Sequence, residues 1–271
     1  GVEVTGLLAA WLSAHPEALT IGVTGTKGKS TTSQVCADLL RAAGTDVALG
    51  GNIGVPVIDL PDDAAVYVLE VSSYQASDVG HSPTVGVLTS LGEDHLPWHG
   101  GRDRYWSDKL GLFAHAGLRT VVTHAGLLEH PAVRDLSWSP GATTAATDPS
   151  VRRDGEVLWV DGSPIAIEGV LGSPHNAANL ELAVRAARLV APDLRTTVDA
   201  STVATVVDAF RGLPSRLETI SDVGGIRVID DALASNPLAA SIAIGAVTDG
   251  PVVLLAGGED REVDIAPFAA L

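Results

Sequence analysis

Residues 22–32 read Gly-Val-Thr-Gly-Thr-Lys-Gly-Lys-Ser-Thr-Thr, and this glycine-rich stretch decides the fold. An apolar run over Leu19–Val23 precedes it and an amphipathic run over Thr31–Ala43 follows it, which predicts a strand, a loop and a helix in that order. Such a loop points backbone N–H groups at a phosphate, and the helix N-terminus adds positive dipole character. The loop is not a strict Walker A sequence, because that spacing requires glycine where Val23 stands. A turn without a ligand would rarely carry Gly-Lys-Ser-Thr-Thr at a helix start, so we predict a phosphate site.

Within the loop, Lys29 is placed to reach the outer phosphates of a nucleotide, and Ser30 is placed to put a hydroxyl on Mg²⁺. The residues of this segment that we expect to bind ATP are Gly25, Thr26, Lys27, Gly28, Lys29, Ser30 and Thr31.

The composition narrows the class of protein. A chain of 271 residues is long for one domain and natural for two. The net charge of −16 would repel a polyanion, so we expect no nucleic-acid partner. Cys36 is the only cysteine, which excludes an internal disulfide. We see no signal peptide and no apolar run of membrane-spanning length, so we expect a soluble, cytoplasmic protein. We also expect a monomer. Because the chain lacks Met, we expect it to be a piece of a longer protein.

Short β-branched runs alternate with helical patterns along the first part of the chain, which predicts a parallel α/β sheet with helices on both faces. Two Asp-Gly pairs flank the short run Glu156–Val160 and predict a small antiparallel hairpin inserted in this fold. The predicted strands are Leu19–Thr24, Ala65–Val71, Val85–Ser90 and Arg119–Thr123. The predicted helices are Ser30–Ala43, Arg102–Ala116, His175–Val190 and Ser201–Phe210.

Gly212-Leu-Pro214 predicts a domain boundary, because it punctuates the chain after a helix. After it, a strand over Ile226–Ile229, a helix over Pro237–Val247 and a strand over Val252–Leu255 restart a βαβ unit. We therefore predict an α/β fold: a parallel-sheet P-loop ATPase domain over residues 1–213 with a small β insertion, then the start of a second, Rossmann-like α/β domain over residues 214–271.

Three further segments place polar groups at strand ends, where open α/β sheets bind ligands. Glu70 directly follows an apolar strand and could hold Mg²⁺, although a solvated glutamate is an equally good interpretation of this residue alone. His95 lies in Glu93-Asp-His95 after the next strand, and imidazole is a less usual Mg²⁺ ligand than oxygen. Lys109, on the helix that follows, would by itself be read as a solvated cation.

Together, the loop and these segments resemble the Mur ligase family, the ATP-dependent amide ligases of peptidoglycan synthesis. The resemblance runs from about Leu19 to Asp264 and is closest to the branch that joins glutamate to UDP-N-acetylmuramoyl-L-alanine. The further motifs that carry it are Gly50-Gly-Asn-Ile-Gly54, Pro174-His-Asn-Ala-Ala-Asn179, Gly212-Leu-Pro-Ser-Arg216, Ile229-Asp-Asp-Ala-Leu-Ala-Ser-Asn-Pro237 and Leu255-Ala-Gly-Gly-Glu-Asp-Arg261.

The resemblance implies a role for each matching residue. It makes Lys29, Glu70, His95 and Lys109 catalytic. It implies further ATP contacts from Asn176, Asn179, Arg216 and Asp231. It implies substrate contacts from Asn52, Ser72, Ser73, Gln75, Ser235 and Arg261. It implies that Mg²⁺ is held by Ser30, Glu70, His95 and Lys109, the lysine as a carbamate formed with CO₂.

The resemblance also implies the reaction and the missing parts. The substrate carboxylate takes the γ-phosphate of ATP to form an acyl phosphate, which the glutamate amine then attacks. The family's UDP-binding first domain would precede Gly1, and its third domain would be cut after its first βαβ unit.

Two positions depart from the family pattern and leave the amino acid open. Leu233 stands where the family has Lys, and Arg261 aligns with a Lys that contacts the incoming glutamate. Arg and Lys recognise carboxylates differently, so both D- and L-glutamate are kept as substrates. Two other functions also stay open: another ligase of the superfamily, such as a folylpolyglutamate or cyanophycin synthetase, and a non-catalytic nucleotide-binding module.

Overall fold

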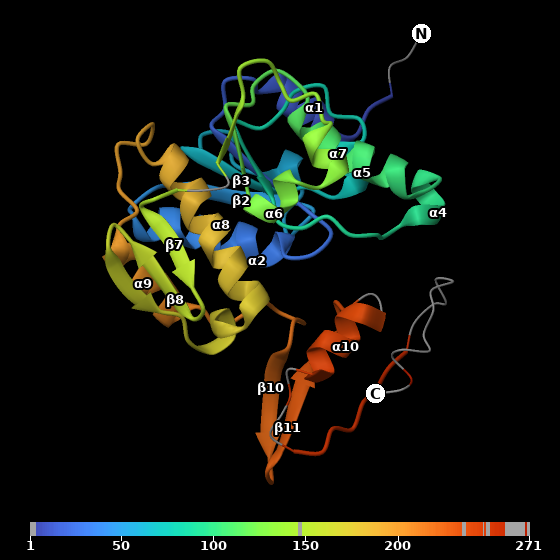
Figure 1. The fold of residues 1–271 in the computed structure, drawn as a ribbon, viewed down its shortest axis with the longest axis vertical. Coiled ribbons are helices and arrows are strands. Elements are labelled where there is room, and N and C mark those ends of the chain that lie inside the picture. Colours follow the sequence, from blue (N-terminus) through green and yellow to red (C-terminus); the bar gives the residue numbers. More distant parts are fainter. Residues whose placement is uncertain are drawn as a thin grey trace. The chain divides into compact units, whose positions relative to one another are not determined.

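The computed structural model describes residues 4–145, 148–234, 237–245, 247, 250–257 and 269 of the chain. The chain divides into two compact units, Gly1–Phe210 and Arg211–Leu271. Figure 1 shows their elements, and each unit is described by itself.

The first unit is built on a six-stranded sheet with the order β2-β3-β1-β4-β5-β6, and every neighbouring pair is parallel. The strands are β1 (Thr20–Thr24), β2 (Val47–Gly51), β3 (Val66–Glu70), β4 (Val85–Leu88), β5 (Thr120–Thr123) and β6 (Thr143–Ala145). The predicted parallel sheet is confirmed, and the four predicted strands differ from the observed ones by at most two residues at an end. Strands β2 and β6 were not predicted.

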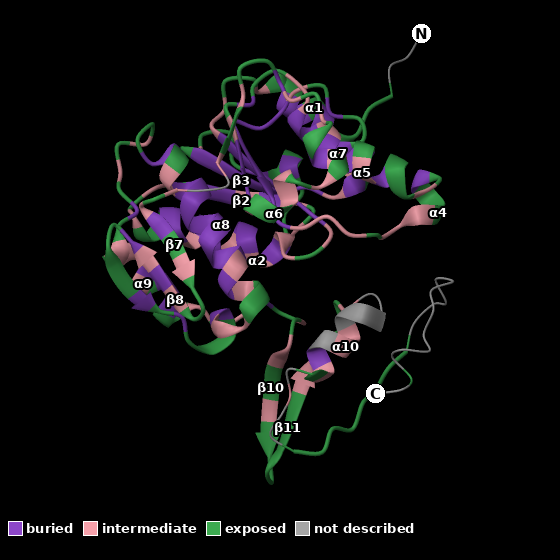
Figure 2. Cartoon of the chain, viewed as in Figure 1, coloured by how far each residue is buried: buried purple, intermediate pink, exposed green. Residues whose placement is uncertain are grey.

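Side chains of the central strands alternate between two apolar cores, one on each face of the sheet. On β3, for example, Val66 and Val68 join one core, while Tyr67 and Leu69 join the other. The first core contains residues of α2 (Lys29–Ala42), α8 (Pro174–Val190) and α9 (Ala200–Ala209), and the second contains residues of α1 (Leu7–Ala14). Figure 2 shows the buried residues concentrated in the sheet and in α2 and α8.

The inserted segment is larger than the predicted hairpin. Strands β7 (Val151–Asp154), β8 (Val157–Val160) and β9 (Ser163–Ala166) form a three-stranded antiparallel sheet. The two Asp-Gly pairs do lie at its turns, where Asp161 and Gly162 both have positive φ. One face packs into the first core through Val151, Leu158, Val160 and Ile165.

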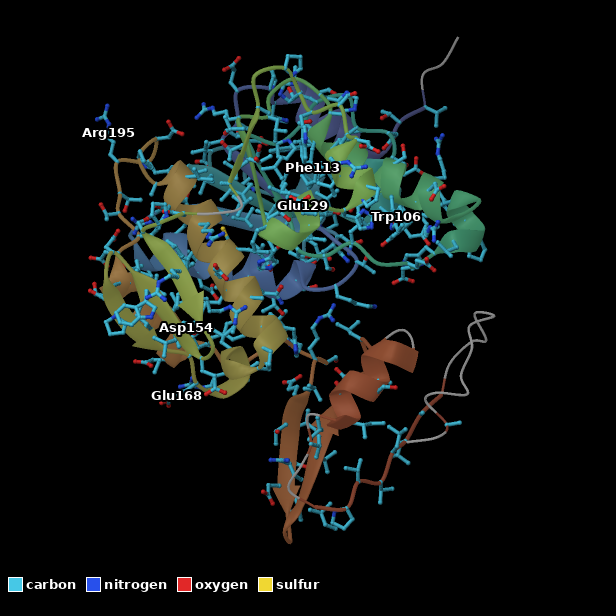
Figure 3. The ribbon with its side chains drawn as sticks, viewed as in Figure 1. Trp106, Phe113, Glu129, Asp154, Glu168 and Arg195 are labelled. Atoms are coloured by element: carbon cyan, nitrogen blue, oxygen red, sulfur yellow. The ribbon has the colours of Figure 1, made fainter. Side chains whose placement is uncertain are left out.

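The helix predicted over Arg102–Ala116 ends early: α5 spans Arg102–Leu110, and a 3₁₀ turn, η2, follows over Gly111–Phe113. The chain tightens there because Leu112 and Phe113 both enter the second core and are fully buried. Phe113 and Trp106 of α5 are labelled in Figure 3.

The remaining helices of the first unit are short. They are α3 (Ser73–Ala76), α4 (Leu96–His99), α6 (Ala125–Leu128), α7 (Pro131–Arg134) and the 3₁₀ turns η1 (Val57–Asp59) and η3 (Gly169–Gly172). In the described part of the chain, no helix combines the length and the apolar character needed to cross a membrane.

The second unit contains an antiparallel pair, β10 (Glu218–Val223) and β11 (Ile226–Asp230), and the helix α10 (Pro237–Gly245). The predicted strand over Val252–Leu255 is wrong, since these residues have no regular structure and are exposed, Leu255 at 94%. A strand needs a neighbour to pair its N–H and C=O groups, and no described strand pairs with this run.

Candidate active site

The glycine-rich loop connects β1 to α2 and places a helix N-terminus at the carboxyl edge of the sheet. Gly28 caps α2 with a left-handed backbone, φ 88°. A Cβ on Gly28 would collide with the side-chain oxygen of Asn179, and one on Gly25 would collide with Thr89. Glycine is therefore required at these two positions for two reasons: the backbone conformation disfavours other residues, and neighbouring side chains leave no room for a Cβ.

Two lysine amines converge on one carbonyl of the loop. The Nζ atoms of Lys29 and Lys109 each lie 3.1 Å from the Gly25 oxygen. Lys109 is 1% exposed, and its Nζ also lies 4.9 Å from the centre of the Tyr105 ring. Burial, and next the charge of Lys29, lowers the pKa of Lys109 to about 7, against an opposing effect of Asp94. A large fraction of this amine is therefore neutral at neutral pH, unlike a solvated lysine.

We expect Lys109→Met to stabilise the folded chain at neutral pH. Because the pKa of Lys109 falls from 10.5 to about 7 on folding, the unfolded chain binds more protons between these pH values. The penalty for burying the amine is thus full below about pH 7 and disappears as the pH rises towards 10.5. Each tenfold change in the ionisation equilibrium contributes about 1.4 kcal/mol. After loss of the hydrogen bond to Gly25, we expect a net gain of about 1–3 kcal/mol.

Thermal unfolding of both proteins from pH 6 to pH 10 measures this prediction. Lys27→Met, which removes a more exposed lysine from the glycine-rich loop, is the matched control. A stability difference that stays constant with pH would mean that the buried amine is not its source.

Glu70 ends β3 beside the loop, in register with Val23 of β1. It is 2% exposed, and its Oε1 accepts a 2.6 Å hydrogen bond from the Asn52 side chain. Its Oε2 is buried and has no hydrogen-bond partner. A buried carboxylate oxygen without a donor is costly unless a cation binds it, so this oxygen fits a metal ligand.

The described residues contain no group of three or more His, Cys, Asp or Glu side chains placed to share a metal. This result is compatible with Mg²⁺, which is usually bound by one or two carboxylates together with phosphate and water.

His95 lies after β4, in the left-handed region with φ 52°, at the start of α4. Its Nε2 lies 3.7 Å from Asp94 Oδ1, and the other Asp94 oxygen lies 3.6 Å from Lys27 Nζ. Glu93 instead faces outward and pairs with Arg102 at 3.7 Å. His95 is thus linked to the loop through Asp94.

Several residues that were predicted to contact the substrate form hydrogen bonds with neighbouring protein groups. Ser72 and Gln75 form a capping box at the start of α3: the Gln75 N–H donates to Ser72 Oγ, and the Ser72 N–H donates to Gln75 Oε1. Ser73 is buried and lies beside His99. The Asn52 amide is committed to Glu70. Their substrate contacts remain predictions.

The first two turns of α8 carry Asn176 and Asn179, for which ATP contacts are predicted. Asn176 donates to the Val170 carbonyl at 2.9 Å, and Asn179 lies 3.4 Å from Asn176 and against Gly28. The start of α8 therefore meets the glycine-rich loop. Ser30 and Thr31 lie in the first turn of α2, beside the same loop.

The other predicted residues belong to the second unit. The Asp231 carboxylate accepts a hydrogen bond from the Leu217 N–H at 3.0 Å, and burial raises its pKa. The backbone of Arg216 forms an isolated antiparallel β-bridge with that of Leu213. Ser235 and Arg261 lie outside the described residues.

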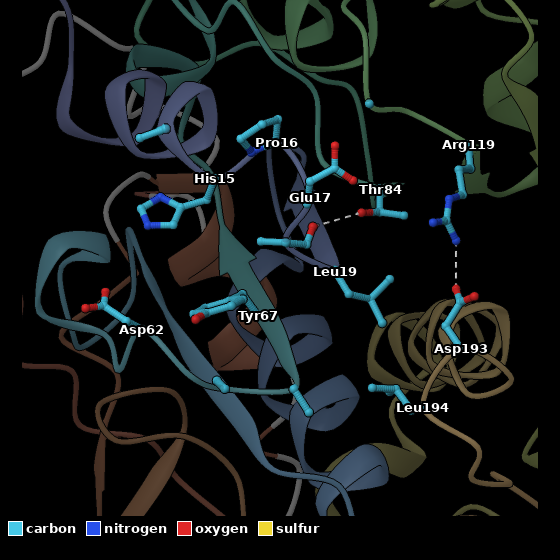
Figure 4. Close-up of a pocket in the computed structure, with 15 residues that line it drawn as sticks. His15, Pro16, Glu17, Leu19, Asp62, Tyr67, Thr84, Arg119, Asp193 and Leu194 are labelled. Carbon is cyan, nitrogen blue, oxygen red and sulfur yellow. Dashed lines mark hydrogen bonds and ion pairs between the residues drawn. The ribbon is translucent and has the colours of Figure 1, made fainter.

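A hollow of about 850 Å³ lies at the opposite edge of the sheet (Figure 4). Its lining includes Leu19, Ala65, Thr84 and Arg119, which directly precede β1, β3, β4 and β5. Arg119 is already paired with Asp193 at 2.7 Å. Since open α/β sheets bind ligands at the carboxyl ends of their strands, we place the candidate site at the loop.

The sequence profile described as Mur ligase middle domain matches residues 23–187, which is more than half of the chain. The chain belongs to the Mur ligase family. The matched region contains the loop, Glu70, His95 and Lys109.

Individual Mur ligase relatives match over nearly the whole chain. It is 43% identical to a Micromonospora sp. protein named UDP-N-acetylmuramoyl-L-alanine--L-glutamate ligase, with 99% of this chain and 59% of that protein covered. It is 35% identical to the UDP-N-acetylmuramoylalanine--D-glutamate ligase of Deinococcus radiodurans, with 100% and 56% covered. The chain thus spans less than two thirds of the length of these curated relatives.

A solved structure supports the fold of this Mur ligase chain. The MurF ligase from Thermotoga maritima in complex with ADP superposes with a TM-score of 0.62 at 21% identity, covering 91% of this chain and 62% of that one.

Proposed function

We propose that this chain is the nucleotide-binding part of an ATP-dependent, ADP-forming ligase that adds L-glutamate to UDP-N-acetylmuramoyl-L-alanine in peptidoglycan precursor synthesis. The observation that carries the proposal is the group of residues at the glycine-rich loop. Glu70 has a buried carboxylate with one oxygen that lacks a hydrogen-bond partner, and Lys109 places a buried amine against the loop. The names of relatives at 43% and 41% identity favour L-glutamate. Such an enzyme works in the cytoplasm, where ATP is available.

The chemistry requires ATP because a carboxylate is a poor electrophile. The substrate carboxylate attacks the γ-phosphorus, ADP leaves, and an acyl phosphate forms. The glutamate amine then attacks the acyl carbon, phosphate leaves, and the amine loses a proton. Positioning and charge neutralisation dominate catalysis of phosphoryl transfer. Lys29 and the loop N–H groups are placed to hold the phosphates.

The donor set also fits Mg²⁺, which when bound would neutralise phosphate charge. Glu70 Oε2 is the best-prepared ligand, and Ser30 and His95 are the other candidates from this chain. Lys109 joins the set only as a carbamate, in which its neutral amine has added CO₂ and released one proton. Its burial and its pKa of about 7 favour that reaction.

The two predicted domains would have different tasks. We assign ATP binding to residues 1–213 and the first part of an amino-acid-binding domain to residues 214–271. The resemblance to the family also assigns ATP contacts to Arg216 and Asp231. Ser235 and Arg261 would contribute to the amino-acid pocket.

The test is an amino-acid panel with the full-length protein, ATP, Mg²⁺ and UDP-N-acetylmuramoyl-L-alanine, read by phosphate release and product mass. We expect release to depend on L-glutamate. Dependence on D-glutamate would correct the stereochemistry, and release with a folyl or other acceptor would replace the substrate class. Nucleotide binding without turnover on any acceptor would favour a non-catalytic module.

We expect Lys29→Ala to weaken Mg-ATP binding at least about tenfold. The substitution removes a flexible cation at the loop, and a hydrogen bond to a charged group contributes about 1.5–3 kcal/mol. Calorimetry with Mg-ATP measures the change. Arg41→Ala, which removes an exposed cation at the far end of α2, is the control. Equal affinities of Lys29→Ala and wild type would move the phosphate site away from the loop.

A further inference from the structure

A continuous chain of buried hydrogen bonds joins α3, α4 and α5. Ser73 Oγ lies 3.0 Å from His99 Nε2, and His99 Nδ1 lies 2.8 Å from Asp108 Oδ2. All three residues are buried, and the His99 side chain has no exposed surface. Neither His99 nor Asp108 was predicted as a site residue, because only the packing of the three helices brings them together.

The hydrogen-bonding groups of Ser73, His99 and Asp108 are paired with one another and with Arg104. An ionised carboxylate only accepts hydrogen bonds, so His99 Nδ1 donates to Asp108 and, in the neutral ring, Nε2 accepts from the Ser73 hydroxyl. The other Asp108 oxygen lies 2.8 Å from Arg104 Nε. Tyr74 stacks on the imidazole at 5.5 Å. Ser73, although it has a histidine and an aspartate aligned behind it, is 3% exposed and is not placed as a nucleophile.

Each member lies within about one helical turn, along the chain, of Glu70, His95 or Lys109. Ser73 begins the helix that follows Glu70, and His99 ends the short helix that begins directly after His95. Asp108 is the immediate neighbour of Lys109 on α5. The hydrogen bonds therefore link the backbone segments that carry the carboxylate and the amine of the site.

We propose that the Ser73–His99–Asp108 chain holds the segments of Glu70 and Lys109 at the separation that metal-nucleotide binding and phosphoryl transfer require. His99 is then a positioning residue and does not touch substrate. This inference rests on the proposed function. A misplacement of about 1 Å can lower a rate by about 10²-fold, so loss of one link should affect turnover more than nucleotide binding.

The test uses two variants of the full-length protein. Ser73→Ala removes the hydroxyl that bonds Nε2, and Asp108→Asn removes the charge that holds Nδ1 and Arg104 while keeping an oxygen that can accept from Nδ1. We expect kcat to fall about 10- to 100-fold while KM for ATP changes by less than about threefold. Binding of Mn²⁺ to the ADP-saturated protein, measured by calorimetry, should weaken by at least about threefold. Ser77→Ala at the end of α3 and Asp103→Asn on α5 are matched controls, because they make the same chemical changes, loss of a hydroxyl and loss of a negative charge, at exposed positions.

Two substitutions of His99 separate its two links. The amide nitrogen of Asn can replace Nδ1 as donor and keep the bond to Asp108, whereas the amide oxygen of Gln can replace Nε2 as acceptor and keep the bond to Ser73. A double-mutant cycle tests whether these links act together. In the His99→Asn background, which already lacks the bond to Ser73, Ser73→Ala should lower kcat little further. In the Asp103→Asn background, Ser73→Ala should lower kcat by its full factor.

The proposal is overturned if folded Ser73→Ala and Asp108→Asn match their controls in both kcat and Mn²⁺ affinity. It is also overturned if their lost turnover equals the loss of folded protein measured by thermal unfolding. Failure of the wild type to ligate glutamate, with the Mn²⁺ effect intact, would reject the proposed function and keep the positioning role. If the wild type ligates glutamate and the variants match their controls in kcat and Mn²⁺ affinity, the positioning role is rejected and the proposed function is kept.

Discussion

Lys109→Ala is expected to remove at least about 99% of the turnover of the full-length protein while Mg-ATP affinity stays within about threefold of wild type. The variant loses a buried amine that is 1% exposed and lies 3.1 Å from the loop carbonyl of Gly25. If this amine works as a carbamate, the vacant position lacks an anionic metal ligand, and charge stabilisation of this kind is worth about 10²–10³ in kcat. Initial rates and calorimetry measure the two quantities.

Chemical rescue decides what Lys109 supplies. Formate or acetate should partly restore the activity of Lys109→Ala by occupying the space of the carbamate, and wild-type activity should rise with CO₂ supply. Asp103→Ala, from the exposed face of the same helix, keeps Lys109 and should behave like the wild type, with a response to CO₂ supply and none to formate or acetate. Restoration by small amines, without restoration by carboxylates, would mean that Lys109 acts as a cation on phosphate.

Glu70→Gln is expected to lower turnover at least about 100-fold and to raise the Mg²⁺ concentration needed for half-maximal activity. Gln keeps the shape of Glu70 and an oxygen for Asn52, but it puts an N–H₂ donor where the unpaired oxygen lies. A metal ion or a phosphate that needs a carboxylate there is then poorly held. A Mg²⁺ titration of the initial rate measures both effects.

Stability separates this role of Glu70 from a structural one. Replacing a buried charge that has an unpaired oxygen should leave the thermal stability unchanged or increase it. Glu70→Asp, which keeps the charge on a shorter side chain, should retain more activity than Glu70→Gln. A large loss of stability in Glu70→Gln, or full activity at low Mg²⁺, would contradict the assignment.

The local features of this protein could be predicted from its sequence because their causes are local. The order strand, loop and helix around residues 22–32 follows from hydrophobic periodicity, and Gly28 is required by a positive φ at the helix start. The alternation of strands and helices likewise predicted the parallel sheet and its carboxyl edge as the binding edge. The strand predicted over Val252–Leu255 failed because a strand depends on a pairing partner that periodicity does not reveal.

The partners of individual site side chains were decided only by the tertiary structure. The pairing of β2 with β3 brings Asn52 to Glu70, and the position of β4 beside β1 brings Lys109 to the carbonyl that Lys29 also contacts. Lys109, which in the sequence alone resembled a solvated cation, became a buried amine with a pKa of about 7. Sequence by itself determined the phosphate loop and the family, because backbone conformation and hydrophobic period are properties of neighbouring residues. Burial and charge proximity depend on residues far apart in the chain, so only the folded structure decided the ionisation of Lys109 and the unpaired oxygen of Glu70.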